Sequence, residues 1–460
     1  MSEDTNWKNE IKEVGKTVFE LEDMRKLGFL EIDDQTISAI AEKEKEYYKL
    51  LGEERNLNKE IDKELDIRPH LEKIRQKRIE RVAKKREERK KEKAIQEAER
   101  KRNIQEKLTY TPSYLGDEIS TGLNYNSEKP EKLENLQLPS CPSLKELEDL
   151  SKIPAKQWQW LAFHKKVSKT DHYVRFNIPK KNGKLRAIAS PKKQMRNVQT
   201  WIKESILDKI EIHNGAMAFR PNRSIVDNAL AHKDAKILVR IDFKDFFPSI
   251  KFSRVKGIFK SFGYNNALST IFASVCTDSP MREAVINDQK YKIALQDKAL
   301  PQGACTSPAI TNILCRQLDA RLEGLCQKNE WTYTRYADDI VISTQKDKPQ
   351  LKGFLKWVYT IIEDEGLIIN HEKTMIMRPH QRQSVTGIVV NGANDIRISR
   401  KDIRRMHSFI HHLLRNETSK LKLKNNTDPY LYLMGYINFV RMVNSEQADG
   451  LIKYMGKLKE

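Results

Sequence analysis

The chain has 460 residues, with 84 Lys and Arg against 64 Asp and Glu, and therefore a formal net charge of +20. This length suits roughly two to four domains, and the positive charge favours a polyanionic partner such as nucleic acid. No run approaches the ~18 apolar residues of a membrane span, and the acidic start lacks the apolar core of a secretory signal. The five cysteines form no C-x-x-C pair, so we expect neither a zinc site nor a disulfide framework. Because the sequence shows neither a membrane span nor a secretory signal, we expect no membrane partner and a cytoplasmic location.

The first part of the chain divides by charge. Residues 1–72 hold 20 acids and 12 bases, whereas residues 73–107 hold 16 bases and 7 acids. Helix-forming residues dominate, and apolar residues recur at three-to-four spacing before residue 52, so we expect a mostly helical extension over residues 1–107. Residues 73–107 predict one long charged helix. It is either a solvated helix without a ligand or a support that binds a nucleic-acid backbone.

Residues 108–139 are polar and rich in turn-forming residues, including Pro130 and Pro139, and predict a linker. From residue 140 to about residue 390, helical and strand patterns alternate. Residues 391–460 predict helices again, with Ile403, Met406 and Ile410 on one face.

A basic hairpin is predicted first in the mixed region. Two strand-like segments flank Asn182-Gly183, a dipeptide typical of a tight turn. Four cations suit a triphosphate or a template backbone, and a solvated hairpin without a ligand is the alternative. These cations are Lys180, Lys181, Lys184 and Arg186.

Two further segments end in carboxylates. Residues 236–243 alternate like a buried strand that ends at Asp242, where a carboxylate is costly unless it is paired or binds a metal. Residues 333–343 predict a β-hairpin with Asp338 and Asp339 at its turn, although Asp is also an ordinary turn residue. If the strand and the hairpin lie side by side, three carboxylates converge. Such a site suits two Mg²⁺ ions, which can activate a hydroxyl and neutralise a leaving pyrophosphate.

Between these segments lies a loop that leads into a helix. Pro301-Gln302-Gly303 predicts a turn where the backbone can approach a ligand closely. Ser307-Pro308 is a typical helix start. A well-capped core helix without a functional role is the alternative.

Together and in this order, these four segments resemble reverse transcriptases. In that family a metal-binding Asp ends a palm strand beside a Tyr-x-Asp-Asp hairpin, which residues 336–339 match. The Asn-Ala-x-x-His segment at 228–232 and Val-Thr-Gly at 385–387 narrow the resemblance to bacterial retron reverse transcriptases, over about residues 140–460. Residues 216–219 and Cys305 depart from the commoner pattern and leave the subgroup open.

The resemblance implies an α+β right-hand polymerase fold, with fingers and palm at 140–390 and a helical thumb at 391–460, preceded by the helical extension. It implies two Mg²⁺ ions, with Mn²⁺ as a substitute, bound by catalytic Asp242, Asp338 and Asp339 and by the backbone carbonyl of Phe243. The implied dNTP-binding residues are Lys180, Arg186, Phe247, Gln302 and Lys373. The implied RNA- or primer-binding residues are Asn228, His232, Thr386, Gly387, Arg397, Arg404 and Arg405.

Phe247 would exclude a ribose 2′-hydroxyl, and Lys373 would protonate the leaving pyrophosphate. The residues also allow plainer interpretations: Phe246 and Phe247 as core aromatics, and Asn228 and His232 as satisfied core residues.

The resemblance further implies an enzyme, an RNA-directed DNA polymerase. It would bind a cognate structured non-coding RNA, prime from an RNA 2′-hydroxyl and synthesise single-stranded DNA (msDNA) from dNTPs in antiphage defence. Its implied partners are the RNA, the DNA product, a separate effector protein and a host ribonuclease H. Three alternatives stay open: another bacterial reverse transcriptase, group II intron-like or of an unassigned defence type; an RNA-directed RNA polymerase; and a non-catalytic RNA-binding scaffold.

Overall fold

The computed structural model describes residues 6–65, 68–111, 114–117, 119–120, 123, 127–180, 183, 185–391, 395–415, 417, 420–421, 423 and 427–457. The chain divides into two compact units, Met1–Arg102 and Asn103–Glu460. Among the described residues, no helix combines the length and the apolar character that crossing a membrane requires.

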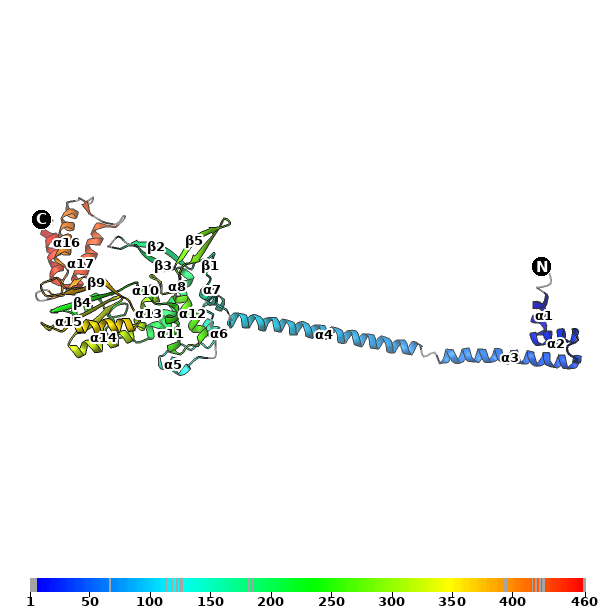
Figure 1. Cartoon of the computed structure of the whole chain (residues 1–460). Helices are drawn as coiled ribbons and strands as arrows, with labels where there is room; N and C mark the ends of the chain where they lie inside the picture. Colours follow the sequence, from blue (N-terminus) through cyan, green and yellow to red (C-terminus); the bar gives the residue numbers. More distant parts are fainter. Residues whose placement is uncertain are drawn as a thin grey trace. The chain divides into compact units, whose positions relative to one another are not determined.

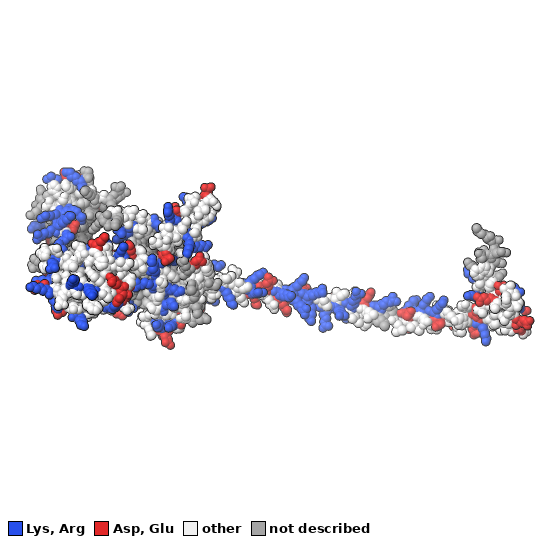
Figure 2. Space-filling model, viewed as in Figure 1, with Lys and Arg blue, Asp and Glu red and all other residues white. Residues whose placement is uncertain are grey.

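The first unit is helical. It contains α1 (Asn6–Val14), α2 (Lys16–Lys26), α3 (Asp34–Glu64) and the first part of α4 (Arg68–Tyr110). Val18 on α2 and Ile37 on α3 are buried, whereas α4 buries no side chain along its 43 residues. Lys and Arg therefore lie exposed along α4 (Figure 2). The long charged helix that the sequence predicted is confirmed.

The second unit contains a four-stranded antiparallel sheet in the order β7-β8-β4-β9, which we call the palm sheet. Its strands are β4 (Ile237–Phe243), β7 (Thr332–Tyr336), β8 (Asp339–Thr344) and β9 (Ile369–Met377). Because successive side chains of a strand point to opposite faces, Val239 and Ile241 enter one hydrophobic core while Leu238 enters another. The palm sheet is therefore covered on both faces.

Different elements cover the two faces (Figure 1). α13 (Ser307–Leu314), α14 (Arg316–Asn329) and α15 (Leu351–Asp364) supply the core on the Val239 side. The Leu238 side is covered by α9 (Ile225–Leu230), the hairpin of β10 (Ser384–Val385) and β11 (Ile388–Val389), and three C-terminal helices. These helices are α16 (Arg400–Leu414), α17 (Pro429–Val443) and α18 (Ser445–Lys457).

The remaining elements surround a second part of the larger core, which includes the fully buried Trp158. β2 and β3 form a hairpin, and β1, β6 and β5 form a three-stranded sheet. The helices are α5 (Pro130–Asn135), α6 (Leu144–Ser151), α7 (Ala155–Ala162), α8 (Lys193–Ser205), η1 (Leu207–Lys209), α10 (Phe246–Ser249), α11 (Phe252–Phe262) and α12 (Asn266–Cys276). The strands are β1 (Val167–Ser168), β2 (Tyr173–Pro179), β3 (Leu185–Pro191), β5 (Met281–Ile286) and β6 (Gln289–Ala294).

The segment 108–139, expected as a linker, takes part in this core. Leu115, Ile119, Leu133 and Leu138 are buried in it, so the described residues of the segment pack against the second unit. The α+β organisation and the helical extension are confirmed, whereas the predicted domain bounds stay predictions.

Candidate active site

The register of the palm sheet brings the predicted carboxylates together. Asp242, at the end of β4, lies directly opposite Asp339, the first residue of β8. Cross-strand partners project from the same face of a sheet, so these side chains are neighbours. Asp338 precedes Asp339 in the turn after β7, and its carbonyl accepts a hydrogen bond from the Phe243 amide at 3.1 Å. We call Asp242, Asp338 and Asp339 the carboxylate cluster.

The turn that carries Asp338 is held in an unusual conformation. Ala337 adopts a positive φ of 58°, which is uncommon for a residue with a side chain. The guanidinium of Arg335 donates a hydrogen bond to the Ala337 carbonyl at 3.1 Å. The position of Asp338 therefore depends on a buried contact beneath the turn.

Burial and the neighbouring carboxylates raise the pKa values of two of the three carboxyl groups. Burial, followed by the nearby Asp242, raises the pKa of Asp338. Burial raises the pKa of Asp339 to about 7, although Arg240 opposes this shift. Arg240 Nε lies 3.6 Å from Asp339 Oδ1, and that buried oxygen has no hydrogen-bond partner among the described residues. Burial is the largest cause of both shifts, so the ionised form of each carboxyl group is disfavoured in this site.

The donor set fits a hard divalent cation. Mg²⁺ takes one or two protein carboxylates and completes its shell with water and substrate phosphates. Asp339 Oδ1 is buried and has no hydrogen-bond partner among the described residues, which costs free energy. A cation bound to this oxygen would remove that cost. Within the described ranges, no three His, Cys, Asp or Glu side chains are close enough to form a metal site by themselves. Phosphate oxygens would therefore have to complete the coordination.

Lys373 and Asn370, both on β9, hold the third carboxylate. Lys373 Nζ donates to Asp242 Oδ2 at 2.7 Å, and Asn370 Nδ2 donates to the same oxygen at 3.1 Å. The sequence predicted Lys373 as a nucleotide-binding residue, and the structure places it against the carboxylate cluster. Asn370 and Arg240 are further neighbours that the sequence did not predict.

The basic hairpin approaches the same site. Arg186 on β3 is exposed, and its charge acts against the upward shift in the pKa of Asp338, so it is close enough to influence the cluster. Lys180 is exposed at the end of β2. Lys181, Asn182 and Lys184 lie outside the described residues.

The Pro301-Gln302-Gly303 turn packs against the strand that carries Arg186. The Ala189 amide on β3 donates to the Gln302 carbonyl at 2.8 Å. Gly303 has a φ of +120°, and a Cβ there would lie 2.9 Å from the Ala189 carbonyl oxygen. The backbones approach so closely that the turn and β3 are positioned together.

The two predicted aromatic residues differ in burial. Phe246 is in the core and stacks on Phe243, with ring centroids 5.4 Å apart. Phe247 is only half-buried and lies edge-on to Phe246. A half-exposed ring close to Asp242 in the chain is available to contact a nucleotide.

Asn228 and His232 require a correction. We expected both to bind RNA or primer, but they are 0% and 1% exposed, so their side chains cannot reach a ligand on the surface. His232 bridges β7 and β8, with Nδ1 2.7 Å from Ser343 Oγ and Nε2 2.7 Å from Thr334 Oγ1. Asn228 Oδ1 accepts a hydrogen bond from the same Thr334 at 2.6 Å. Both side chains therefore form hydrogen bonds to the hairpin that carries Asp338 and Asp339.

The other predicted RNA-binding residues lie outside the carboxylate cluster. Thr386 and Gly387 form the turn between β10 and β11 with positive φ angles, and Thr386 Oγ1 donates to the Ile225 carbonyl at 3.3 Å. Arg404 and Arg405 are exposed on α16, and Arg397 is half-buried before it. RNA contact by these residues stays a prediction.

One buried network was not anticipated. Arg335 donates from Nε and Nη2 to Asp319 at 2.7 Å each, and from Nη1 to Asn312 Oδ1 at 3.1 Å. All three side chains are fully buried. The signal for this network in the sequence was Asp319, which lies between Leu318 and Leu322 on an apolar helix face. A carboxylate buried there requires a cation as its partner.

The chain is similar to several known proteins. Residues 178–414 match the family model for reverse transcriptase (RNA-dependent DNA polymerase). The chain is 33% identical over 346 residues to Retron Mx162 reverse transcriptase of Myxococcus xanthus, covering 72% of this chain and 70% of the relative. It is 30% identical over 329 residues to Retron Ec86 reverse transcriptase of Escherichia coli, covering 72% and 93%. Among solved structures, telomerase from Candida albicans with a telomeric RNA fragment is similar over 62% of this chain and 63% of that one, with 11% identity and a TM-score of 0.39.

Proposed function

This chain belongs to the retron reverse transcriptases and is an RNA-directed DNA polymerase; we propose that it copies part of a cognate structured non-coding RNA into single-stranded DNA. Synthesis starts from a 2′-hydroxyl of that RNA, so the product is a branched RNA–DNA molecule. The enzyme acts in the cytoplasm, and its physiological role is antiphage defence together with a separate effector protein. A host ribonuclease H removes the copied template.

The observation that carries the chemistry is the pairing of Asp242 with Asp339 beside Asp338. In each cycle, a primer hydroxyl attacks the α-phosphorus of a dNTP, a new phosphodiester bond forms, and pyrophosphate leaves. Asp242, Asp338 and the Phe243 carbonyl would hold divalent cations, with Asp339 as the more peripheral carboxylate. Bound Mg²⁺ supplies charge stabilisation to the attacking and leaving oxygens.

Side chains of the chain itself position the nucleotide. Arg186 and Lys180 face developing negative charge on the triphosphate, and the Gln302 turn fixes β3 behind them. Lys373 neutralises Asp242 before the nucleotide binds and is an acid for the departing pyrophosphate. Phe247 excludes a ribose 2′-hydroxyl.

RNA contacts are assigned to cations outside the carboxylate cluster. Arg397, Arg404 and Arg405 bind phosphates at the start of the C-terminal helices, and the Thr386–Gly387 turn lies at the primer end. The exposed Lys and Arg side chains of α4 also bind RNA phosphates (Figure 2). Spaced cations of this kind release counterions from a nucleic-acid backbone.

The test is to express the chain with its flanking non-coding region and to extract nucleic acid. We expect one small DNA species that shifts in size after ribonuclease and 2′,5′-debranching treatment. Asp338→Asn keeps the size of the side chain and should abolish the DNA. Asp149→Asn, at an exposed carboxylate outside the cluster, is the matched control and should leave the DNA unchanged.

The outcomes separate the alternatives. Unbranched DNA would indicate another class of bacterial reverse transcriptase. RNA that co-purifies without any DNA would indicate a binding scaffold and would contradict the polymerase proposal.

A further inference from the structure

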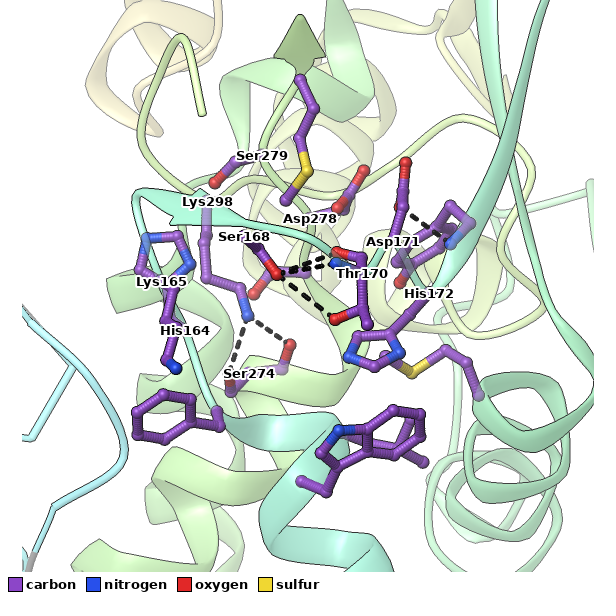
Figure 3. A pocket seen from close by; sticks show the side chains of 17 residues that line it. His164, Lys165, Ser168, Thr170, Asp171, His172, Ser274, Asp278, Ser279 and Lys298 are labelled. Carbon is purple, nitrogen blue, oxygen red and sulfur yellow. Dashed lines mark hydrogen bonds between the residues drawn. The ribbon is translucent and has the colours of Figure 1, made fainter. Parts of the chain in front are cut away.

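A cavity of about 140 Å³ lies away from the carboxylate cluster, between α7, α12 and the β1-β6-β5 sheet (Figure 3). None of the proposed catalytic or nucleotide-binding residues lines it. At about 30 Å³ per water molecule in the liquid, this volume has room for about five water molecules. The cavity is therefore large enough for a small charged group.

Lys298 lines this cavity and is buried, with 9% of its surface exposed. Its ammonium donates to the carbonyl and the hydroxyl of Ser274, each at 2.7 Å. An ammonium has three donors, so one remains without a partner among the described residues. Lysine is almost never fully buried unless an acid pairs with it. Burial lowers the pKa of Lys298 to about 8, which reflects incomplete compensation of its charge.

The acids on the cavity wall are already paired with another cation. Asp278 accepts hydrogen bonds from Arg175 at 2.7 and 3.0 Å, and Asp171 accepts from the same guanidinium at 3.0 and 3.3 Å. Lys292 also lies 3.4 Å from Asp171. The two carboxylates are therefore held mainly by Arg175, whereas the hydrogen bonds of Lys298 go to Ser274.

Ser279 provides a second, independent observation. Its side chain is 2% exposed, lines the cavity, and has no hydrogen-bond partner for Oγ among the described residues. A buried hydroxyl without a partner carries a desolvation cost, which a ligand in the cavity would remove. Lys165 adds an exposed ammonium at the cavity wall, 5.2 Å from the Phe163 ring centroid.

We propose that this cavity binds a phosphate monoester, either the terminal phosphate of an RNA or the phosphate of a free nucleotide. The unpaired donors of Lys298 and Ser279 match phosphate oxygens, which accept several strong hydrogen bonds. Lys298 and Ser274 are both buried, so the phosphate can reach them only if it stands at the end of the ligand. Trp160, Phe163 and His172 provide apolar ring surface for the attached nucleoside.

The test measures binding to the full chain by calorimetry without Mg²⁺. The probes are AMP, adenosine, and one short RNA made with a 5′-phosphate or a 5′-hydroxyl. We expect AMP to bind at least about tenfold more tightly than adenosine, because a charge-assisted hydrogen bond contributes at this level. A gain from the 5′-phosphate of the RNA beyond that seen with AMP identifies an RNA end as the ligand. An equal or smaller gain identifies a free nucleotide.

Lys298→Met tests whether this cavity is where AMP binds. Methionine retains most of the length of the side chain without its charge, and it should weaken AMP binding about tenfold or more. Lys169→Met removes an exposed charge nearby and is the matched control, which should bind AMP like the wild type. Ser279→Ala is a second variant, needed if Lys298→Met does not fold. Equal binding of AMP and adenosine, or unchanged AMP binding in a folded Lys298→Met or in Ser279→Ala, would overturn the proposal.

Discussion

Arg335 and Asp319 form a salt bridge in which both side chains are fully inaccessible to solvent, with Nη2 and Oδ2 2.7 Å apart. Arg335 lies two residues before Ala337 and donates to its carbonyl, whereas Asp319 lies on α14 beneath the sheet. The turn that carries Asp338 is thereby fixed to a helix of the core. A positive φ at Ala337 persists because the surrounding structure determines it.

We predict that substitutions in this pair affect the free energy of unfolding and the activity differently. Arg335→Met leaves the Asp319 charge buried and unpaired, which should lower the free energy of unfolding by about 3–5 kcal/mol. Asp319→Asn retains the acceptor for the Tyr333 hydroxyl. The double variant should therefore lose less stability than Arg335→Met alone, yet remain inactive because Ala337 has lost its donor.

Urea unfolding and primer extension on an RNA template measure the two quantities. A double variant with wild-type activity would show that Arg335 stabilises the fold without positioning the turn.

A second prediction concerns acid stability. Burial lowers the pKa of His232 to about 3, against about 6.5 in an unfolded chain. Between these values the unfolded chain binds a proton that the folded protein does not. The free energy of unfolding should therefore fall as the pH drops below 6.5, by up to about 1.4 kcal/mol per pH unit from this group.

Urea unfolding between pH 5 and pH 7.5 tests this dependence. His232→Asn should be less stable than the wild type at pH 7.5 and should depend less on pH. His371→Asn, at an exposed position, should retain the wild-type slope. Parallel slopes for the wild type and His232→Asn would contradict the assignment.

How far the sequence predicts this site depends on how local each feature is. Strand alternation before Asp242 and the hairpin signal around Asp338 are local patterns, and they predicted the elements that pair in the palm sheet. The buried partners of these elements depend on long-range packing. Nothing in the sequence around Arg335 identifies Asp319 as its partner, because the choice depends on how α14 packs against β7.

Burial was the property that the motifs did not reveal. The spacing of Asn228 and His232 supported the family resemblance, but it did not show that both side chains lie inside the protein. Polar composition likewise predicted a linker at 108–139, although single apolar residues such as Leu115 and Leu133 pack in the core. A few well-placed apolar residues outweigh the average character of a segment.

A third prediction uses the close approach at Gly303. Gly303→Ala would place a methyl group 2.9 Å from the Ala189 carbonyl oxygen, at a φ that disfavours side chains. We expect a loss of about 1–3 kcal/mol in the free energy of unfolding and a higher KM for dNTPs, because β3 carries Arg186. Gly257→Ala is the control, since nothing lies within 4 Å of its added methyl group on α11. It should be stabilising by about 0.5–1 kcal/mol. Thermal unfolding and steady-state kinetics distinguish the two, and equal kinetics would refute a link between Gly303 and the nucleotide site.

A fourth prediction concerns the choice of sugar. Phe247→Val removes a half-exposed ring, and the ratio of kcat/KM for an rNTP to that for the matching dNTP should rise about tenfold or more. Phe246→Leu changes the neighbouring core ring and is the control. It should lower thermal stability without altering the ratio. If the two variants share the wild-type ratio in single-nucleotide extension, Phe247 does not contact the sugar.

The last prediction assigns α4 a measurable electrostatic role. Arg78, Arg81, Lys85 and Arg89 recur at three-to-four spacing, so they lie on one face of a helix that buries no side chain. If this face binds an RNA duplex, changing all four to Gln should weaken binding and reduce the slope of log K against log salt by about 0.9 for each phosphate that the variant no longer neutralises. Gln has a similar helix propensity, so α4 itself should persist. The control changes Lys45, Lys49, Lys59 and Lys63 on α3 to Gln, which removes the same charge from the acidic part of the chain. Filter binding of the structured RNA over a range of salt concentrations should give a shallower line for the α4 variant alone. Parallel lines for the wild type and both variants would mean that α4 is a solvated helix without a nucleic-acid ligand.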